Sequence, residues 1–165
     1  MISFSIWLTL EKESRSKYRK MTQSMSRRLE APIFEPHCTL YGHLKMDIEI
    51  MKLLVDDLAE NYNQFSVNVK KLKTGYSYFK SLYVSIAKNE ILNQLNNSCK
   101  NKFSGSRRYG FDPHISISYG VFSKQEIHVA TKSLIIPNHV VFNGLSIVKI
   151  GKNVKYWETV FHRQF

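Results

Sequence analysis

The chain has 165 residues, of which 43% are hydrophobic, and a net charge of +11 at pH 7. A chain of this length suits a single domain that buries about 70% of its unfolded surface. No apolar run approaches the ~20 residues that cross a bilayer, so we expect no membrane partner. The charge favours a polyanionic partner, a nucleotide or a nucleic acid; a basic protein without such a partner is the alternative.

The first residues are expected to form a strand rather than a signal peptide. Residues 2–10 alternate between apolar side chains and small or polar ones, and no basic flank precedes them. Trp7 is the one large ring on the polar face of this strand. Because Cys38 and Cys99 are the only cysteines, we expect reduced thiols and a cytoplasmic protein, with the nucleus as the alternative.

The rest of the pattern predicts helices and strands, and Asp47 and Ser123 are placed to cap two of the helices. In chain order the expected elements are a helix (11–29), a strand (35–44), a helix (about 48–61), a hairpin (64–74 and 78–87 around Gly75), a helix (89–102), a basic loop (104–110), a strand (113–120), a helix (123–133) and a hairpin (138–150 and 154–164 around Gly151). In the basic loop, Arg107 and Arg108 are either phosphate ligands or solvated charges.

One motif occurs twice. Residues 34–42 read F-E-P-H-C-T-L-Y-G, and residues 111–120 read F-D-P-H-I-S-I-S-Y-G. Other landmarks recur at nearly the interval that separates the two motifs, namely Trp7 with Tyr83 and Gly75 with Gly151. Matches in register favour an internal duplication, roughly 1–76 and 77–165. We therefore predict an α+β fold, a single domain over 1–165 with two pseudo-symmetric lobes, whose antiparallel sheets face a central cleft and whose helices lie outside.

Strand geometry groups the polar residues of each motif. Side chains two positions apart point to the same face, which pairs His37 with Thr39 and His114 with Ser116. The residues between them, Cys38 and Ile115, are expected in the core.

The two motifs differ in length by one residue. Tyr41 lies four positions after the first histidine, whereas Tyr119 lies five positions after the second. An extra residue of this kind is typical of a β-bulge, and a bulge would turn Tyr119 into the cleft.

Two histidines and two short hydroxyls suit attack on a phosphodiester. One imidazole can remove a proton while the other gives one to the leaving oxygen, each contributing roughly 10²–10⁴-fold. The two hydroxyls could donate hydrogen bonds to phosphate oxygens. Trp7, Tyr83 and Tyr119 offer ring faces for a base or ribose. For Tyr83 packing is the favoured interpretation.

The paired H-C-T-L and H-I-S-I resemble the twin signatures of the 2H phosphoesterases. The longer stretches, with S-I-W near the start and Trp157 late in the chain, are similar to the cyclic phosphodiesterase branch. This resemblance implies a bilobal fold built partly from swapped strands. It also implies metal-independent opening of 2′,3′-cyclic phosphates, on nucleotides or RNA ends, or of ADP-ribose 1″,2″-cyclic phosphate, leaving the 2′- or 1″-phosphate.

Carried over by position, His37 and His114 become the acid–base pair, and Thr39 and Ser116 the phosphate ligands. Trp7 and Tyr119 match positions that contact substrate in relatives. The sequence does not fix which imidazole is the base, although we favour His114 activating water and His37 protonating the 3′ oxygen.

Several alternatives remain open. Glu35 and Asp112 lie two positions before the histidines, so a zinc site is conceivable; we expect neither metal nor another cofactor, because the hydroxyls would then have no task. A related enzyme could cleave 2′,5′-oligoadenylate or trim RNA ends. A catalytically silent RNA-binding module is the third interpretation. We expect a monomer.

Overall fold

The computed structural model describes residues 2–103 and 110–165, and these form seven strands, four helices and two 3₁₀ turns. The strands are β1 (Ser3–Leu10), β2 (His37–Leu44), β3 (Phe65–Thr74), β4 (Leu82–Ile86), β5 (His114–Ser118), β6 (His139–Ile150) and β7 (Glu158–Gln164). The helices are α1 (Lys12–Leu29), α2 (Ile48–Ala59), α3 (Glu90–Lys102) and α4 (Lys124–Thr131), and the turns are η1 (Tyr78–Lys80) and η2 (Val154–Tyr156). Arg107 and Arg108 lie outside the described residues.

The helix starts follow from their caps. The Asp47 carboxylate accepts hydrogen bonds from two backbone N–H groups in the first turn of α2, as predicted. Ser123 and Glu126 form a reciprocal capping box at the start of α4. Two helices end earlier than the sequence predicts. Helix α2 ends at Ala59 rather than at about residue 61, and α4 ends at Thr131 rather than at residue 133.

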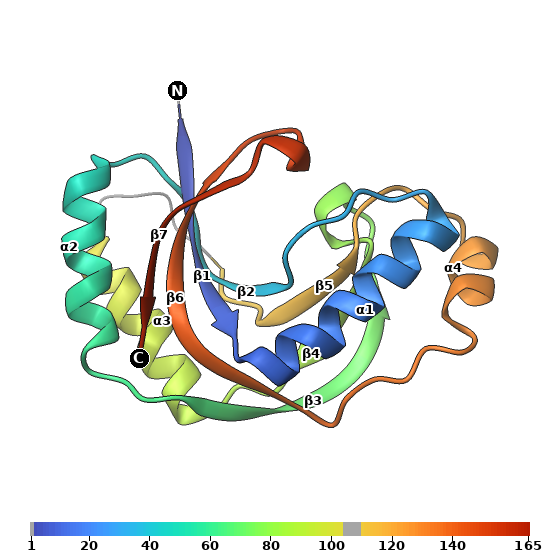
Figure 1. Cartoon of the computed structure of the whole chain (residues 1–165), viewed down its shortest axis with the longest axis horizontal. Helices are drawn as coiled ribbons and strands as arrows, with labels where there is room; N and C mark the ends of the chain where they lie inside the picture. The colour runs from blue at the N-terminus through green and yellow to red at the C-terminus, as the bar shows by residue number, and fades with distance from the viewer. Residues whose placement is uncertain (1, 104–109) are drawn as a thin grey trace.

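All seven strands belong to one antiparallel sheet with the order β2-β1-β6-β3-β4-β5, and β7 pairs with β6 on the edge opposite to β1. The long strand β6 joins the two halves, because its first residues pair with β3 and its later residues with β1. The sheet is bent so strongly that its end strands, β2 and β5, lie side by side in the middle of the molecule (Figure 1). These two strands carry the histidine motifs.

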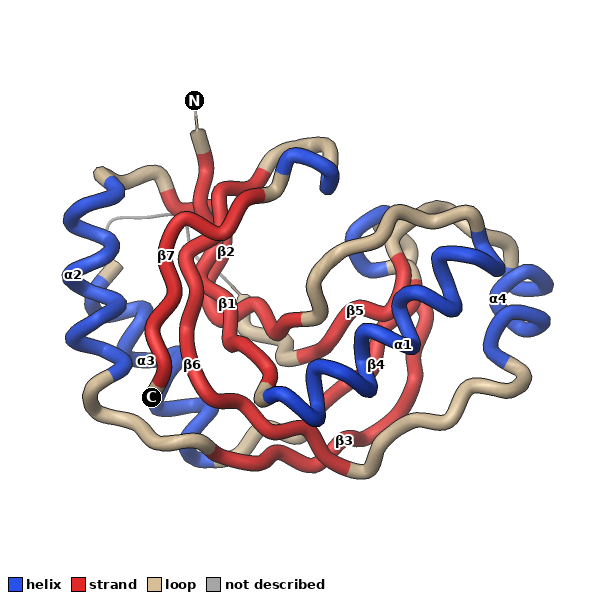
Figure 2. The backbone as a smooth tube through the Cα atoms, in the orientation of Figure 1, coloured by secondary structure: helices blue, strands red, loops and turns tan. Residues whose placement is uncertain are grey.

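Helices cover the outer surfaces of the two halves and cross between them. Helix α1 follows β1 yet packs against β5 and α4, whereas α3 follows β4 yet packs against β2 (Figure 2). The order strand-helix-strand-helix-strand occurs twice, first from β1 to β3 and then from β4 to β6. The predicted fold class, two lobes with helices outside, is confirmed. A duplication of 1–76 and 77–165 as its origin stays a prediction.

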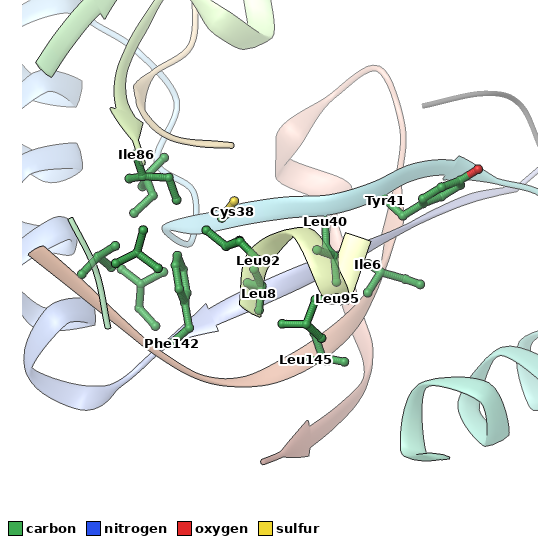
Figure 3. Close-up of a cluster of buried hydrophobic side chains, with 14 of the residues drawn as sticks. Ile6, Leu8, Cys38, Leu40, Tyr41, Ile86, Leu92, Leu95, Phe142 and Leu145 are labelled. Atoms are coloured by element: carbon green, nitrogen blue, oxygen red, sulfur yellow. The ribbon is translucent and has the colours of Figure 1, made fainter. Parts of the chain in front are cut away.

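One continuous hydrophobic core lies between the sheet and its helices. Cys38 and Ile115 belong to it with no exposed surface, as their strand parity predicted. Figure 3 shows Leu40, Leu8 and Leu145 close to two leucines of α3, Leu92 and Leu95. No helix within the described ranges combines the length and apolarity that a membrane crossing requires.

Both histidine strands contain a bulge. In β5 the partner of Tyr83 is Ser116 and that of Leu82 is Ser118, so Ile117 is the extra residue. The predicted bulge is therefore present. An equal bulge, which the sequence comparison missed, places Leu40 as the extra residue in β2. Because both copies contain this bulge, it does not account for the one-residue difference between the motifs, and a comparison of their spacing could not reveal it.

Candidate active site

A cavity of about 220 Å³ lies between the two halves of the sheet. All four residues of the two motifs that were predicted to act in catalysis line it: His37, Thr39, His114 and Ser116. Trp7 and Tyr119 also line this cavity, whereas Tyr83 does not. The structure thus brings six of the seven predicted site residues to one place.

The two imidazole rings are tethered in the same way. The Nδ1 atom of His37 lies 2.7 Å from the carbonyl oxygen of Glu35, and the Nδ1 atom of His114 lies 2.6 Å from that of Asp112. A carbonyl oxygen can only accept a hydrogen bond, so Nδ1 carries the proton in both rings. In each ring Nε2 is therefore the nitrogen left to exchange a proton with a ligand.

The two carboxylates that raised the possibility of a zinc site are engaged elsewhere. The Glu35 carboxylate accepts hydrogen bonds of 2.7 and 2.9 Å from the Arg19 guanidinium, and the Asp112 carboxylate pairs with Lys80. Each pair steadies the segment whose backbone carbonyl holds a histidine. Within residues 2–103 and 110–165 no three His, Cys, Asp or Glu side chains gather as metal ligands.

Trp7 lies against the face of His37. The two ring centroids are 3.4 Å apart with an angle of 5° between the planes, and the indole N–H donates to the Ser5 hydroxyl at 3.1 Å. Trp7 is 5% exposed and His37 is 7% exposed. The sequence predicts that the Trp7 ring offers a face to a base; one face of this ring is occupied by His37, and Trp7 also lines the cavity.

The two histidines have different electrostatic surroundings. Burial lowers the pKa of His37 to about 3, because the charged imidazolium would lose its hydration. Burial also lowers the pKa of His114, and the nearby Lys80 adds to this effect while Asp112 opposes it. His114 is the more exposed of the two rings. At neutral pH His37 is therefore the stronger candidate for a neutral imidazole.

The remaining polar groups face the same space. The Ser116 hydroxyl donates a long hydrogen bond, 3.4 Å, to the carbonyl oxygen of Phe79, and the Tyr119 hydroxyl lies within hydrogen-bonding reach of Ser116. Burial raises the pKa of Tyr119, which keeps this phenol neutral. Thr39 is half-buried at the cavity wall. Two hydroxyls and one phenol are thus available as hydrogen-bond donors.

Tyr83 contacts the site without lining the cavity. Its ring lies edge-on to that of His114 at a centroid distance of 5.2 Å, and the Lys80 ammonium lies 4.7 Å above the Tyr83 ring. Its place beside His114, matching that of Trp7 beside His37, follows from the strand register, in which Tyr83 pairs with Ser116 and Trp7 with Thr39.

Eight further residues line the cavity that the sequence analysis did not assign to the site: Ser5, Gly42, His43, Phe79, Lys80, Ile150, Gly151 and Trp157. Phe79 and Lys80 lie on η1, and Trp157 follows η2. The rings of Phe79 and Trp157 stack at a centroid distance of 5.6 Å, and the Trp157 indole N–H donates to the Gly151 carbonyl oxygen at 2.8 Å. The sequence did mark the positions of the two turns, because each turn follows one of the repeated glycines, Gly75 and Gly151.

The sequence matches a known protein family over its whole length. A family model described as cyclic phosphodiesterase-like protein matches residues 1–165. The chain belongs to this family. Cyclic phosphodiesterase of Arabidopsis thaliana, a curated relative, is 20% identical over 95% of this chain and 92% of its own length.

Solved structures of other proteins share the fold of this cyclic phosphodiesterase-like protein. TT0787 of Thermus thermophilus has a TM-score of 0.66 at 13% identity, covering 98% of this chain and 97% of its own. LigT of E. coli in complex with 3′-AMP has a TM-score of 0.62 at 14% identity, covering 99% and 97%. These likenesses show a shared fold. The family match and the curated relative place the chain in the 2H phosphoesterase superfamily and support a phosphodiesterase activity.

Proposed function

We propose that this cyclic phosphodiesterase-like protein opens 2′,3′-cyclic phosphates of nucleotides or RNA ends, or ADP-ribose 1″,2″-cyclic phosphate, without a metal ion. The observation that supports this most strongly is the matched tether of His37 and His114, whose Nδ1 atoms are both bound by backbone carbonyls at the wall of one cavity. Two imidazoles presented through Nε2 can act on opposite sides of one phosphorus atom.

In the proposed reaction a water oxygen forms a bond to phosphorus and the bond between phosphorus and the 3′ oxygen breaks. One imidazole takes the proton of the water, and the other gives a proton to the 3′ oxygen. The product is a 2′-phosphate with a free 3′ hydroxyl. The hydroxyls of Thr39 and Ser116 donate hydrogen bonds to the non-bridging oxygens, where negative charge grows in the transition state.

The surroundings of the two rings favour His37 as the base and His114 as the acid. This assignment is the reverse of the one favoured from the sequence, in which His114 activates water and His37 protonates the 3′ oxygen. His37 is covered by Trp7 and its pKa is lowered to about 3, so it is neutral before substrate binds. Burial lowers the pKa of His114 as well, but this ring is more exposed than His37 and Asp112 opposes the shift, so we assign the proton to His114. The bound phosphate anion would raise the pKa of the acid further.

Aromatic side chains on one wall suit the nucleoside part of the substrate. Phe79 is 41% exposed and stacks with Trp157 at the cavity, and base stacking on an aromatic ring is worth roughly 1–3 kcal/mol. LigT of E. coli has been crystallised with 3′-AMP, NADP⁺ and ATP. These complexes of a relative support a nucleotide as the ligand of this site.

The test is a panel of substrates in excess chelator. It contains 2′,3′-cyclic mononucleotides, oligoribonucleotides with a cyclic phosphate end, ADP-ribose 1″,2″-cyclic phosphate and 2′,5′-oligoadenylate, with products identified by ³¹P NMR. We expect turnover of the cyclic phosphates to 2′- or 1″-phosphates at an undiminished rate. Loss of activity on chelation, restored by zinc, would contradict the metal-free mechanism, and cleavage of 2′,5′-oligoadenylate alone would replace the proposed substrate.

A further inference from the structure

A second groove begins where the active-site cavity ends. Its volume is about 590 Å³, and it shares two wall residues with the cavity, Trp7 and His37. The other walls come from α1, β1, β6, β7 and the segment before β2. Because His37 lines both spaces, a substrate whose phosphate reaches this histidine can extend into the groove.

The floor of the groove is the same sheet face that carries the active site. Trp7 pairs with Thr39 on one side and with Ser146 on the other, and Ser146 pairs with His162. All four residues therefore project from one face, in a row that runs from the cavity into the groove. Ser146 Oγ and His162 Nδ1 lie 3.0 Å apart. Asn143, Thr159 and Gln164 line the groove as well. Hydrogen-bonding groups thus continue from the cavity across three further strands.

One wall of the groove is positively charged. Lys12, Arg15 and Arg19 are spaced by three and four residues along α1, so they share one flank of the helix and span about 10 Å. The carboxylate of Glu35, the one acidic group that lines the groove among the described residues, is already paired with Arg19. Lys12 and Arg15 are exposed and have no ion pair among the described residues.

A bound mononucleotide would offer no anionic group to Lys12 and Arg15. A nucleoside 2′,3′-cyclic phosphate has one phosphate group, and the proposed reaction places that group between the two histidines. In an RNA with a cyclic end, the 5′ oxygen of the last ribose carries another phosphate, and further phosphates follow at regular spacing. Polar groups on the floor and cations on one wall are the features that bind a sugar–phosphate chain without reading its bases.

We propose that the groove lined by Lys12, Arg15 and His162 binds the sugar–phosphate chain of an RNA whose cyclic phosphate end lies in the active site. This inference rests on the proposed function and names its substrate as an RNA end rather than a free nucleotide. The chain enters past Trp7 and His37 and runs along β6 and β7, with its phosphates facing α1.

The test compares a 2′,3′-cyclic mononucleotide with a five-nucleotide RNA that carries a 2′,3′-cyclic phosphate. The groove variant is Lys12→Gln with Arg15→Gln. The matched control is Lys20→Gln with Arg27→Gln, which removes the same charge from exposed positions of the same helix that do not line the groove. Arg19 is left intact because it holds Glu35 next to His37.

We expect the unmodified protein to prefer the RNA by about tenfold in kcat/KM, through a lower KM. The groove variant loses this preference for RNA but keeps its mononucleotide turnover within twofold. The control variant keeps both the preference and the turnover. The dependence of log kcat/KM for the RNA on log salt concentration becomes shallower by roughly 1.4, which corresponds to two lost contacts to a single strand. Equal turnover of both substrates by the unmodified protein, or equal effects of the two double variants, would overturn the groove assignment.

A binding measurement separates this inference from the proposed function. Fluorescence anisotropy with a labelled five-nucleotide RNA ending in a 3′-phosphate reports groove binding without any turnover. Weaker binding of the groove variant, with unchanged binding of the control, supports the groove even if cyclic phosphates are not hydrolysed. Hydrolysis of cyclic mononucleotides with no difference in RNA binding between the variants would leave the proposed function standing and end the proposal for the groove.

Discussion

Each active-site histidine is held by a backbone carbonyl, but a different neighbour covers each ring. Trp7 lies flat on His37 at 3.4 Å, whereas Tyr83 meets His114 edge-on at 5.2 Å. A flat stack removes water from a whole face of the imidazole, and an edge contact does not. The two halves thus place chemically equal groups in unequal surroundings, and the proposed mechanism uses this difference to give the two histidines different tasks.

Replacing Trp7 with leucine tests how burial sets the pKa of His37. Without the indole, water reaches the imidazole face, so we expect the His37 pKa to rise from about 3 towards its ordinary value of 6.5 by at least about one pH unit. NMR titration of the histidine ring protons measures the change, and His114 serves as the internal control. A pKa of His37 that does not move would show that Trp7 is not what keeps the ring dry.

The two hydroxyls at the cavity wall should act on the transition state rather than on binding. Thr39→Val and Ser116→Ala each remove one donor to the developing charge, which we expect to cost about 2–4 kcal/mol in kcat. Steady-state kinetics with a 2′,3′-cyclic nucleotide separates the two parameters. A rise in KM with an unchanged kcat would instead assign these hydroxyls to ground-state binding.

At the scale of elements, two equivalent hairpin turns complete the cavity. The turn after Gly75 supplies Phe79 and Lys80, and the turn after Gly151 leads to Trp157. The glycines differ in the space around them. A Cβ atom at Gly75 would lie 2.1 Å from the carbonyl oxygen of Lys80, whereas nothing lies within 4 Å of a Cβ at Gly151.

The variants Gly75→Ala and Gly151→Ala should therefore differ sharply. The first forces the backbone at Lys80 to move, which we expect to destabilise the fold by about 1–3 kcal/mol and to lower kcat/KM, because Lys80 borders the cavity. The second should leave the melting temperature within about 2 °C of the original. Thermal unfolding and initial rates measure both effects, and equal behaviour of the two variants would refute the close contact.

The individual helices, strands and turns could be predicted from the sequence because neighbouring residues determine them. Period-two alternation, the caps Asp47 and Ser123 and the turn glycines all act within a few residues. The pairing of β6 with both β1 and β3 could not be read, since periodicity says which face of a strand is buried but not which strand lies beside it.

The histidine motifs were predictable because they repeat, whereas other parts of the site were not. The repeated glycines Gly75 and Gly151 mark the turns that lead to Lys80 and Trp157, but the sequences of the two turns differ, so no repeat singled out these two side chains. The stack of Trp7 on His37 was hidden for another reason. It depends on the register between β1 and β2, and a bulge at Leu40 shifts that register. Strand parity placed Trp7 on the correct face but could not show which ring it meets.

At the scale of the whole molecule, burying a histidine couples the active site to stability. Below pH 6.5 the unfolded chain binds a proton on His37, whereas the folded protein, whose His37 pKa is about 3, does not. Stability is therefore lost as the pH falls from about 6.5 to 3, by up to about 1.4 kcal/mol per pH unit, and His37 contributes no pH dependence above that range.

A His37→Asn variant should resist mild acid better than the original protein does. Between pH 7 and pH 5 we expect the unmodified protein to lose about 2 kcal/mol more of its free energy of unfolding than the variant, because asparagine binds no proton in either state. Urea unfolding at the two pH values gives the difference. Parallel losses in both proteins would mean that His37 is protonated in the folded state as readily as in the unfolded chain.

The paired imidazoles are the centre of the account, and hydrolysis of 2′,3′-cyclic AMP in chelator by His37→Ala and His114→Ala tests them most directly. Both side chains line a cavity rather than fill the core, so both variants should keep a cooperative unfolding transition. Each should lose at least about 10²-fold in kcat, as the removal of a general acid or base requires. Turnover within tenfold of the original in either folded variant would contradict the acid–base pair.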